Sequence, residues 1–450
     1  MPGSMNILEK LRGEGLGAVL ARGTAGSFAV KSAGVWILLA AHLLLTRLLG
    51  AEGYGVYSYI ISWLTVLVVL AKLGQDSALV RFVAAYNAEG NWPALKGILK
   101  RSDTLVLLAS VALGLLLALA VLALGTRLDR ELRSAFLIGS LILPLMSFLA
   151  LRESSLQGLR QVVRAQLPTR VLNPLLLAVA LLATYLFITS PIDSTTALWC
   201  TLFTYSVSLT VSSFWLRRSL SRPVKEARPI YFSRLWLSVG AGMLLVNGQF
   251  LIMNRIDILM LGYFSGKTEV GIYAVAARLA WLVTFLLEAL SVIGAPLISE
   301  LHSKKRTEDL QRLIHWMIGV SAFFSIGLFL LLALWGDFFL GFFGQAFTAG
   351  HKSLTILAAG QLFNSLTGPL GILLTMTGHE KKLGVILFLA LALNTILNYF
   401  LIPRYGIVGA AVATSSVTVL WNAASVIMVR SQLGIYSLPF LGRKDKIFKK

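Results

Sequence analysis

Long apolar runs separated by short polar gaps dominate this chain of 450 residues. A helix that spans a bilayer needs roughly 20 mostly apolar residues. In lipid, such a run satisfies its backbone hydrogen bonds as a helix. The pattern therefore predicts an all-α polytopic membrane protein with about twelve transmembrane helices, at residues 27–49, 56–73, 104–124, 136–156, 171–189, 196–216, 236–261, 270–293, 313–335, 354–377, 383–403 and 407–429.

Composition strengthens this prediction. Hydrophobic residues make up 57% of the chain and charged residues 13%, and the mean hydropathy is +0.79, which is more apolar surface than a soluble fold can bury. The formal net charge of +20 comes from Lys and Arg that cluster between the apolar runs, as signals of membrane topology do. Nucleic acid is therefore not an expected partner. The single cysteine, Cys200, excludes an intrachain disulfide, and no metal site or other cofactor is expected.

The basic residues also predict an orientation. Gaps after the odd-numbered runs hold six Lys or Arg, whereas the termini and the remaining gaps hold 29. Because cytoplasmic loops carry the excess of Lys and Arg, both termini are expected in the cytoplasm, in a multi-pass protein of the cytoplasmic (inner) cell membrane. Residues 5–20 predict a retained interfacial amphipathic helix rather than a signal peptide.

One short motif recurs 216 residues apart. Leu48–Tyr57 and Gly262–Tyr273 share Gly and Tyr positions, and each lies between two long apolar runs. Such a repeat predicts two parallel six-helix halves around a central cavity. The expected domains are an N-terminal half with the interfacial helix, a basic cytoplasmic connector, a C-terminal half and a basic cytoplasmic tail, at residues 1–216, 217–234, 235–429 and 430–450.

Four segments carry a family resemblance through the order and spacing of their residues: Thr46–Gly55, Leu73–Phe82, Asn254–Gly262 and Tyr405–Thr414. The chain resembles the polysaccharide exporters that include Wzx-type O-antigen flippases, in the MATE-like superfamily of multidrug, oligosaccharidyl-lipid and polysaccharide exporters. The resemblance implies a flippase, not an enzyme, that moves a polyprenyl-diphosphate-linked oligosaccharide from the inner to the outer leaflet for surface polysaccharide assembly. Lipid II flippases of this superfamily carry two additional helices, and twelve spans depart from that pattern.

Ionisable side chains inside the apolar runs are candidates for function, because each costs about 2.5 to 3.5 kcal/mol at mid-membrane. Arg offers a bidentate fork to phosphate oxygens and Lys a compact positive charge, so an anionic diphosphate substrate suits them. Arg47, Lys72 and Arg152 also lie near span ends, where long side chains reach the membrane surface. The candidate substrate-binding residues are Lys31, Arg47, Lys72, Arg152, Arg255 and Arg278.

Two acidic residues in the second half, Asp257 and Glu288, admit two roles. They could neutralise neighbouring cations, or they could carry a coupling proton or sodium ion. The repeat offset places Lys72 opposite Glu288, and Lys31 opposite Asn247. Pro174 and the Gly368–Pro369 pair are expected to kink their helices.

The resemblance leaves rival functions open. A MATE-like multidrug or small-solute exporter would share the fold. A polytopic glycan polymerase or glycosyltransferase is disfavoured, because such enzymes need a sizeable external loop or an acidic catalytic cluster and the outer gaps here are short. The favoured mechanism is alternating access, in which the head group enters from the cytoplasm while the lipid tail stays in the bilayer.

Overall fold

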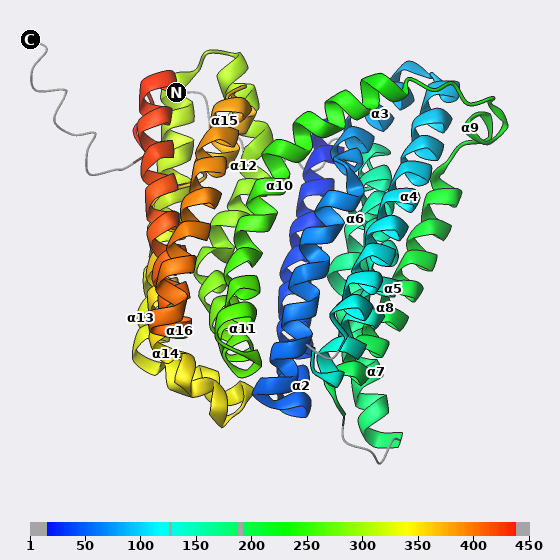
Figure 1. Ribbon diagram of the computed structural model, residues 1–450. Coiled ribbons are helices and arrows are strands. Elements are labelled where there is room, and N and C mark those ends of the chain that lie inside the picture. Colours follow the sequence, from blue (N-terminus) through cyan, green and yellow to red (C-terminus); the bar gives the residue numbers. More distant parts are fainter. Residues whose placement is uncertain (1–15, 126–127, 188–191, 438–450) are drawn as a thin grey trace, which may run out of the picture. The chain divides into compact units, whose positions relative to one another are not determined.

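The computed structural model describes residues 16–125, 128–187 and 192–437, and every regular element among them is a helix (Figure 1). This confirms the all-α prediction. Most of the interfacial helix predicted at residues 5–20 lies outside the described residues, as does the side chain of Asn247. The chain divides into two compact units, here called the N-terminal unit (residues up to 45 and 67–244) and the C-terminal unit (residues 46–66 and from 245 onward).

Nine elements precede the boundary between the units at residues 244 and 245. They are α2 (Leu16–Lys72), α3 (Gln75–Glu89), α4 (Trp92–Leu124), α5 (Arg130–Gly158), α6 (Val162–Leu167), the π-helical turn η2 (Pro168–Leu172), α7 (Asn173–Phe187), α8 (Ser194–Ser219) and α9 (Arg222–Glu226). The boundary itself falls inside α10 (Ser233–Phe264), and residues 46–66 of α2 belong to the C-terminal unit.

The remaining elements all belong to the C-terminal unit. They are α11 (Lys267–Trp281), the 3₁₀ turn η3 (Leu282–Thr284), α12 (Phe285–Ser303), α13 (Thr307–Phe343), the 3₁₀ turn η4 (Gln345–Gly350), α14 (His351–Thr367), α15 (Leu370–Met376) and α16 (Glu380–Leu433). The predicted division into two six-helix halves at the connector 217–234 stays a prediction.

Glycines break the two longest helices. A straight helix of the 57 residues of α2 would be about 85 Å long, whereas the hydrocarbon core is about 30 Å thick. Gly50 interrupts α2 with φ 66°, and Gly406 interrupts α16 with φ 53°, a region that favours glycine. Each helix therefore corresponds to two of the predicted spans.

Among the described residues, eight helices are long and apolar enough to cross a membrane, or up to ten with two bent pairs. When α2 and α16 are each divided at their glycine into two spans, the count of up to ten is consistent with the twelve predicted spans. One bent pair is α14 with α15, which meet at 41° across Gly368 and Pro369, so the kink expected there is confirmed.

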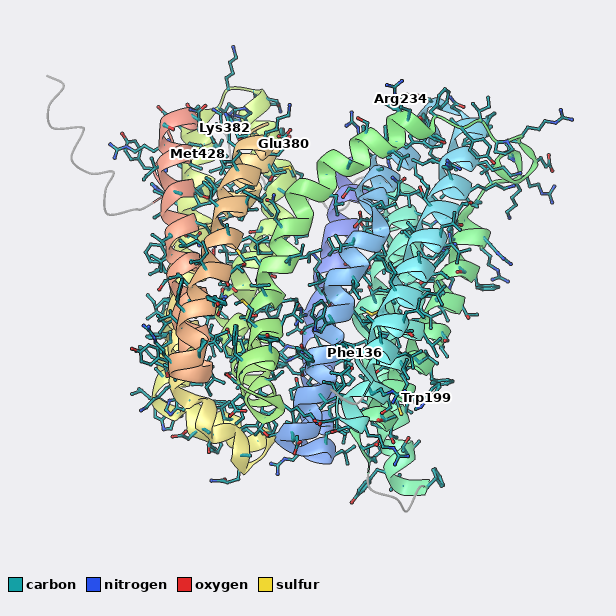
Figure 2. All side chains as sticks on the ribbon, in the orientation of Figure 1. Phe136, Trp199, Arg234, Glu380, Lys382 and Met428 are labelled. Carbon is teal, nitrogen blue, oxygen red and sulfur yellow. The ribbon has the colours of Figure 1, made fainter. Side chains whose placement is uncertain are left out.

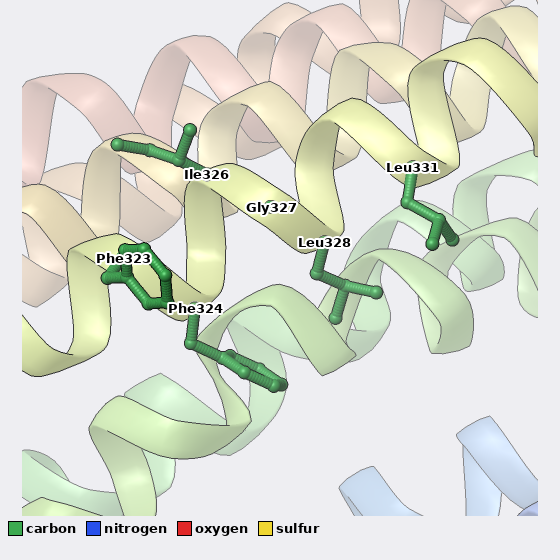
Figure 3. A pocket seen from close by; sticks show the side chains of 6 residues that line it. All are labelled: Phe323, Phe324, Ile326, Gly327, Leu328 and Leu331. Carbon is green, nitrogen blue, oxygen red and sulfur yellow. The ribbon is translucent and has the colours of Figure 1, made fainter.

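Apolar side chains cover the outside of the helices. On α4, Leu108, Leu115 and Leu119 are about 60% exposed. Leucines that face lipid are exposed in this way, whereas a soluble protein buries leucines in its core. An open groove of about 490 Å³ on α13 has the same character (Figure 3). Its lining, from Phe323 to Leu331, is entirely apolar, so we assign this groove to the lipid-facing surface rather than to a polar substrate site.

The predicted connector packs onto the N-terminal unit. Trp236 is buried and its indole N–H donates to the Tyr86 hydroxyl at 3.2 Å. A Cβ on Gly97 would lie 1.8 Å from the Ile230 carbonyl oxygen, and the Ile230 N–H donates to the Pro93 carbonyl at 3.1 Å. The predicted connector, together with Trp236 just after it, is therefore an integral part of this unit. Figure 2 shows Arg234 at its end, far from Phe136 and Trp199.

Candidate functional site

The predicted site residues divide between the two units. Lys31, Lys72 and Arg152 belong to the N-terminal unit. The C-terminal unit holds the other candidates, which are Arg47, Arg255, Asp257, Arg278 and Glu288.

Glu153 of α5 is the centre of a charged cluster in the N-terminal unit. Its carboxylate interacts electrostatically with Arg170, Lys72 and Lys31. The Gln157 amide donates a hydrogen bond to it at 3.2 Å. We call Glu153, Lys31, Lys72 and Arg170 the Glu153 cluster; its cations lie at the ends of three predicted spans, and each acts electrostatically on the one carboxylate.

A π-helical turn presents Arg170 to this cluster. Pro174 has no N–H, so the Arg170 carbonyl four residues earlier lacks its usual helical donor. The Asn173 N–H donates to the Pro168 carbonyl five residues earlier, which is the π-helical pattern. A Cβ on Gly34 would lie 2.6 Å from the Arg170 carbonyl oxygen, so α2 packs directly on this turn, one helical turn from Lys31. The irregularity expected at Pro174 is thus a π turn immediately before it, a feature often found at functional sites.

The cluster keeps an excess of positive charge. The Lys72 ammonium forms an ion pair with Asp76 at 2.6 Å, so three cations share the two carboxylates of Asp76 and Glu153. All four members of the cluster lie within a few residues of the ends of the predicted spans 27–49, 56–73, 136–156 and 171–189. An anionic group that enters there can replace a carboxylate as the partner of these cations.

Arg152 lies outside the Glu153 cluster although it is the next residue to Glu153. Adjacent residues of a helix point about 100° apart, and Arg152 extends to α4, where it forms an ion pair with Asp103 at 2.9 Å. Of the three candidate cations in this unit, the structure therefore brings together Lys31 and Lys72.

Asp257 is the most enclosed acidic candidate, at 5% exposed in the C-terminal unit. The Tyr273 hydroxyl of α11 donates to its carboxylate at 2.6 Å, and the Thr414 hydroxyl of α16 lies 3.4 Å from the same oxygen. Arg255 interacts with it electrostatically. This arrangement gives a buried carboxylate with hydroxyl oxygens from two further helices, a set of hard ligands suited to a proton or a sodium ion.

Arg47 and Glu288 of the C-terminal unit contact groups other than Asp257. Arg47 is exposed and donates to the carbonyls of Phe342 at 2.6 Å and Gly341 at 3.1 Å, which end α13. Glu288 is exposed and accepts from the Trp281 indole N–H at 2.9 Å. The Nε of Arg278 is buried and has no hydrogen-bond partner among the described residues.

Sequence reasoning missed Arg170, Tyr273 and Thr414. Arg170 counted only as a topology signal in a basic gap, and Tyr273 only as part of the repeated motif. The one signal for Arg170 was Pro174 four residues later, which frees its carbonyl and disturbs the helix there.

Known proteins share this fold and parts of this sequence. The relative Agl15 of Haloferax volcanii, a probable low-salt glycan biosynthesis flippase, is 27% identical over 233 residues, which is 51% of this chain and 48% of that protein. The chain thus matches about half the length of this curated relative. The solved structure of lipid II flippase MurJ in an inward closed conformation aligns with a TM-score of 0.70 at 14% identity, covering 92% of this chain and 87% of MurJ.

A multidrug resistance MATE family transporter of the MOP superfamily, solved in its inward-facing conformation, aligns with a TM-score of 0.68 at 15% identity, covering 95% of this chain and 97% of that one. At these identities the two structures establish a shared fold. Residues 242–400 match the MatE family. Residues 20–302, more than half of the chain, match the family described as polysaccharide biosynthesis protein, and the chain therefore belongs to that family.

Proposed function

We propose that this protein is a flippase that moves a polyprenyl-diphosphate-linked oligosaccharide from the inner to the outer leaflet by alternating access, without covalent chemistry on the substrate. The observation that carries the proposal is the Glu153 cluster, in which Lys31, Lys72 and Arg170, at the ends of predicted spans, act electrostatically on one carboxylate. Membership of the polysaccharide biosynthesis protein family supports the same class of substrate.

The diphosphate is the part of this substrate that the Glu153 cluster suits. Phosphate oxygens accept charge-assisted hydrogen bonds from Lys and Arg, and Arg offers two donors at once. Without substrate, the Glu153 carboxylate is the anion that interacts electrostatically with all three cations. Diphosphate binding would then exchange one anion for another, which avoids leaving bare charge inside the membrane.

Topology adds a driving force to this proposal. We place both termini in the cytoplasm and the protein in the cytoplasmic membrane, as the distribution of Lys and Arg favours. The span ends that hold the Glu153 cluster then face the cytoplasm. A membrane potential that is negative inside favours outward movement of an anion by about 2.3 kcal/mol per charge per 100 mV.

Asp257 is the proposed site of a coupling ion, either a proton or sodium. The hydroxyls of Tyr273 and Thr414 complete an oxygen-lined site around its carboxylate, whereas Glu288 is exposed beside Trp281. Arg255 supplies the balancing charge when the ion leaves. The roles of Arg47, Arg152 and Arg278 in substrate binding stay predictions.

Transport of a fluorescent polyprenyl-diphosphate oligosaccharide in proteoliposomes tests the proposal. Lys31→Gln combined with Arg170→Gln should lower the initial flipping rate at least about tenfold, as expected when two charge-assisted contacts are lost. The control is Arg81→Gln, an exposed cation of α3 outside the cluster. Full activity of the double variant would reject the role of the cluster, and no flipping by the unmodified protein would reject the function.

A multidrug exporter is the second candidate, because a buried carboxylate such as Asp257 can bind a cation and residues 242–400 match the MatE family. Efflux of a cationic dye that is lost in Asp257→Asn, with no flipping of the diphosphate probe, would favour it.

A further inference from the structure

A second basic site lies in the N-terminal unit, on the side of α5 that carries Arg152. A cavity of about 350 Å³ opens where α4, α5, α8 and α9 meet. The short helix α9 closes it from the connector and packs on α4 (Figure 1), with Val224 buried among the α4 side chains. The ionisable residues that line the cavity are Lys96, Lys100, Asp103, Arg152, Arg217 and Lys225.

The charges of this cavity do not balance. Asp103 pairs with Arg152 at 2.9 Å, and Lys96 donates to the main-chain carbonyl of Lys225. Asp103 is the one carboxylate among the described residues that line the cavity, so five cations against one carboxylate leave a surplus of four positive charges. The Nε of Arg152 is also buried and finds no hydrogen-bond partner in the described part of the chain.

The rest of the lining is apolar apart from Ser213. Leu99, Leu216 and Leu220 form it together with Val224. A ligand that fits both parts is an anion with several acceptor oxygens on or beside an apolar body. Phosphate groups meet this description, since they accept charge-assisted hydrogen bonds from several Lys and Arg at once. Basic pockets between membrane helices bind phospholipid head groups in this way.

We propose that this cavity binds a phosphate group, from the head group of an anionic phospholipid or from a soluble phosphate compound. The bound group joins Lys100 of α4 and Arg217 of α8 to Lys225 of α9, and so fastens the connector to the N-terminal unit. The site is distinct from the Glu153 cluster and holds whether or not the protein is a flippase.

Thermal unfolding of the full chain in lipid nanodiscs tests this site. One set of discs contains phosphatidylcholine alone, a second also contains phosphatidylglycerol, and a third contains phosphatidylcholine with inorganic phosphate at constant ionic strength. The pocket variant is Lys100→Gln combined with Arg217→Gln. The matched control is Arg222→Gln combined with Arg228→Gln, which removes the same charge from exposed connector residues that do not line the cavity.

Phosphatidylglycerol should raise the unfolding midpoint of the unmodified protein and of the control. The pocket variant should bind it at least about tenfold more weakly, and its midpoint should therefore rise less. A response to inorganic phosphate alone identifies a soluble ligand, and a response to phosphatidylglycerol alone identifies a lipid. Lys225→Gln removes one exposed cation from the same cavity. As a second test with one substitution, it should also reduce the rise in the midpoint. Equal losses in the pocket and control variants, or no response of the unmodified protein to either ligand, would overturn the proposal.

Discussion

Gly55 and Gly271, 216 residues apart in the repeated motif, pack backbone against backbone within the C-terminal unit. A Cβ on Gly55 would lie 1.7 Å from the Lys267 carbonyl oxygen, and a Cβ on Gly271 would lie 2.1 Å from that of Ala51. Glu52 and Lys267 form an ion pair at 3.9 Å beside them. The two copies of the motif therefore do more than resemble each other, because they form one contact that neither could form with a larger residue.

Either glycine should be intolerant of alanine. Gly55→Ala or Gly271→Ala must push two helices apart, which costs about 1 to 3 kcal/mol, as overpacking does. The unfolding midpoint in detergent should fall for each variant. Gly319→Ala is the control, because nothing lies within 4 Å of a Cβ there, and it should be neutral or stabilising by about 0.5 to 1 kcal/mol. A loss in the control as large as in the pair would contradict the packing explanation.

Removal of the Glu153 charge should strengthen diphosphate binding. In the proposed exchange, Glu153 competes with the substrate for Lys31, Lys72 and Arg170. Glu153→Gln is expected to lower the Kd for a polyprenyl diphosphate about tenfold, equal to about 1.4 kcal/mol, and to lower the unfolding midpoint without ligand because three cations lose a partner.

The comparison for that variant is Glu226→Gln, which removes an exposed carboxylate of α9, and its Kd should not change. Equilibrium binding of the lipid in detergent measures both. If Glu153→Gln weakened binding as Lys31→Gln is expected to do, Glu153 would be a structural partner of the cations and not a competitor of the substrate.

The spans could be predicted from sequence because hydropathy depends on local composition alone. Gly50 and Gly406 lie in the gaps between predicted runs, and both interrupt a helix there. The site was harder to predict, because a partner such as Asp103 or Tyr273 depends on which helix faces which, and twelve similar apolar runs carry little information about that. Arg152 and Glu153 illustrate this limit of sequence-based prediction. They are neighbours in one apolar run, yet Arg152 pairs with Asp103 of α4 and Glu153 interacts with Arg170, Lys72 and Lys31.

The oxygen set around Asp257 predicts a sodium or proton effect on stability. Tyr273→Phe removes a 2.6 Å hydrogen bond to a buried carboxylate and should cost about 1.5 to 3 kcal/mol, as hydrogen bonds to charged groups do. If sodium binds, replacing choline by sodium should raise the unfolding midpoint of the unmodified protein. Asp257→Asn should abolish that rise, whereas Thr414→Ser, which keeps the hydroxyl, should retain it. A sodium response that survives in Asp257→Asn would place the ion elsewhere.

The contact between Gly97 and the connector should control how firmly the connector is held. Gly97→Ala would place a Cβ 1.8 Å from the Ile230 carbonyl oxygen and so strain the Ile230 N–H bond to Pro93. We expect a loss of about 1 to 3 kcal/mol in stability and faster proteolysis between residues 220 and 236.

Gly242→Ala, in the same unit with nothing within 4 Å of its Cβ, should leave the cleavage rate unchanged. Limited trypsin digestion of the protein in detergent measures this directly, because the connector holds Arg222, Lys225 and Arg228. Unchanged cleavage in Gly97→Ala would mean that the connector is held by Trp236 and Val224 rather than by this contact.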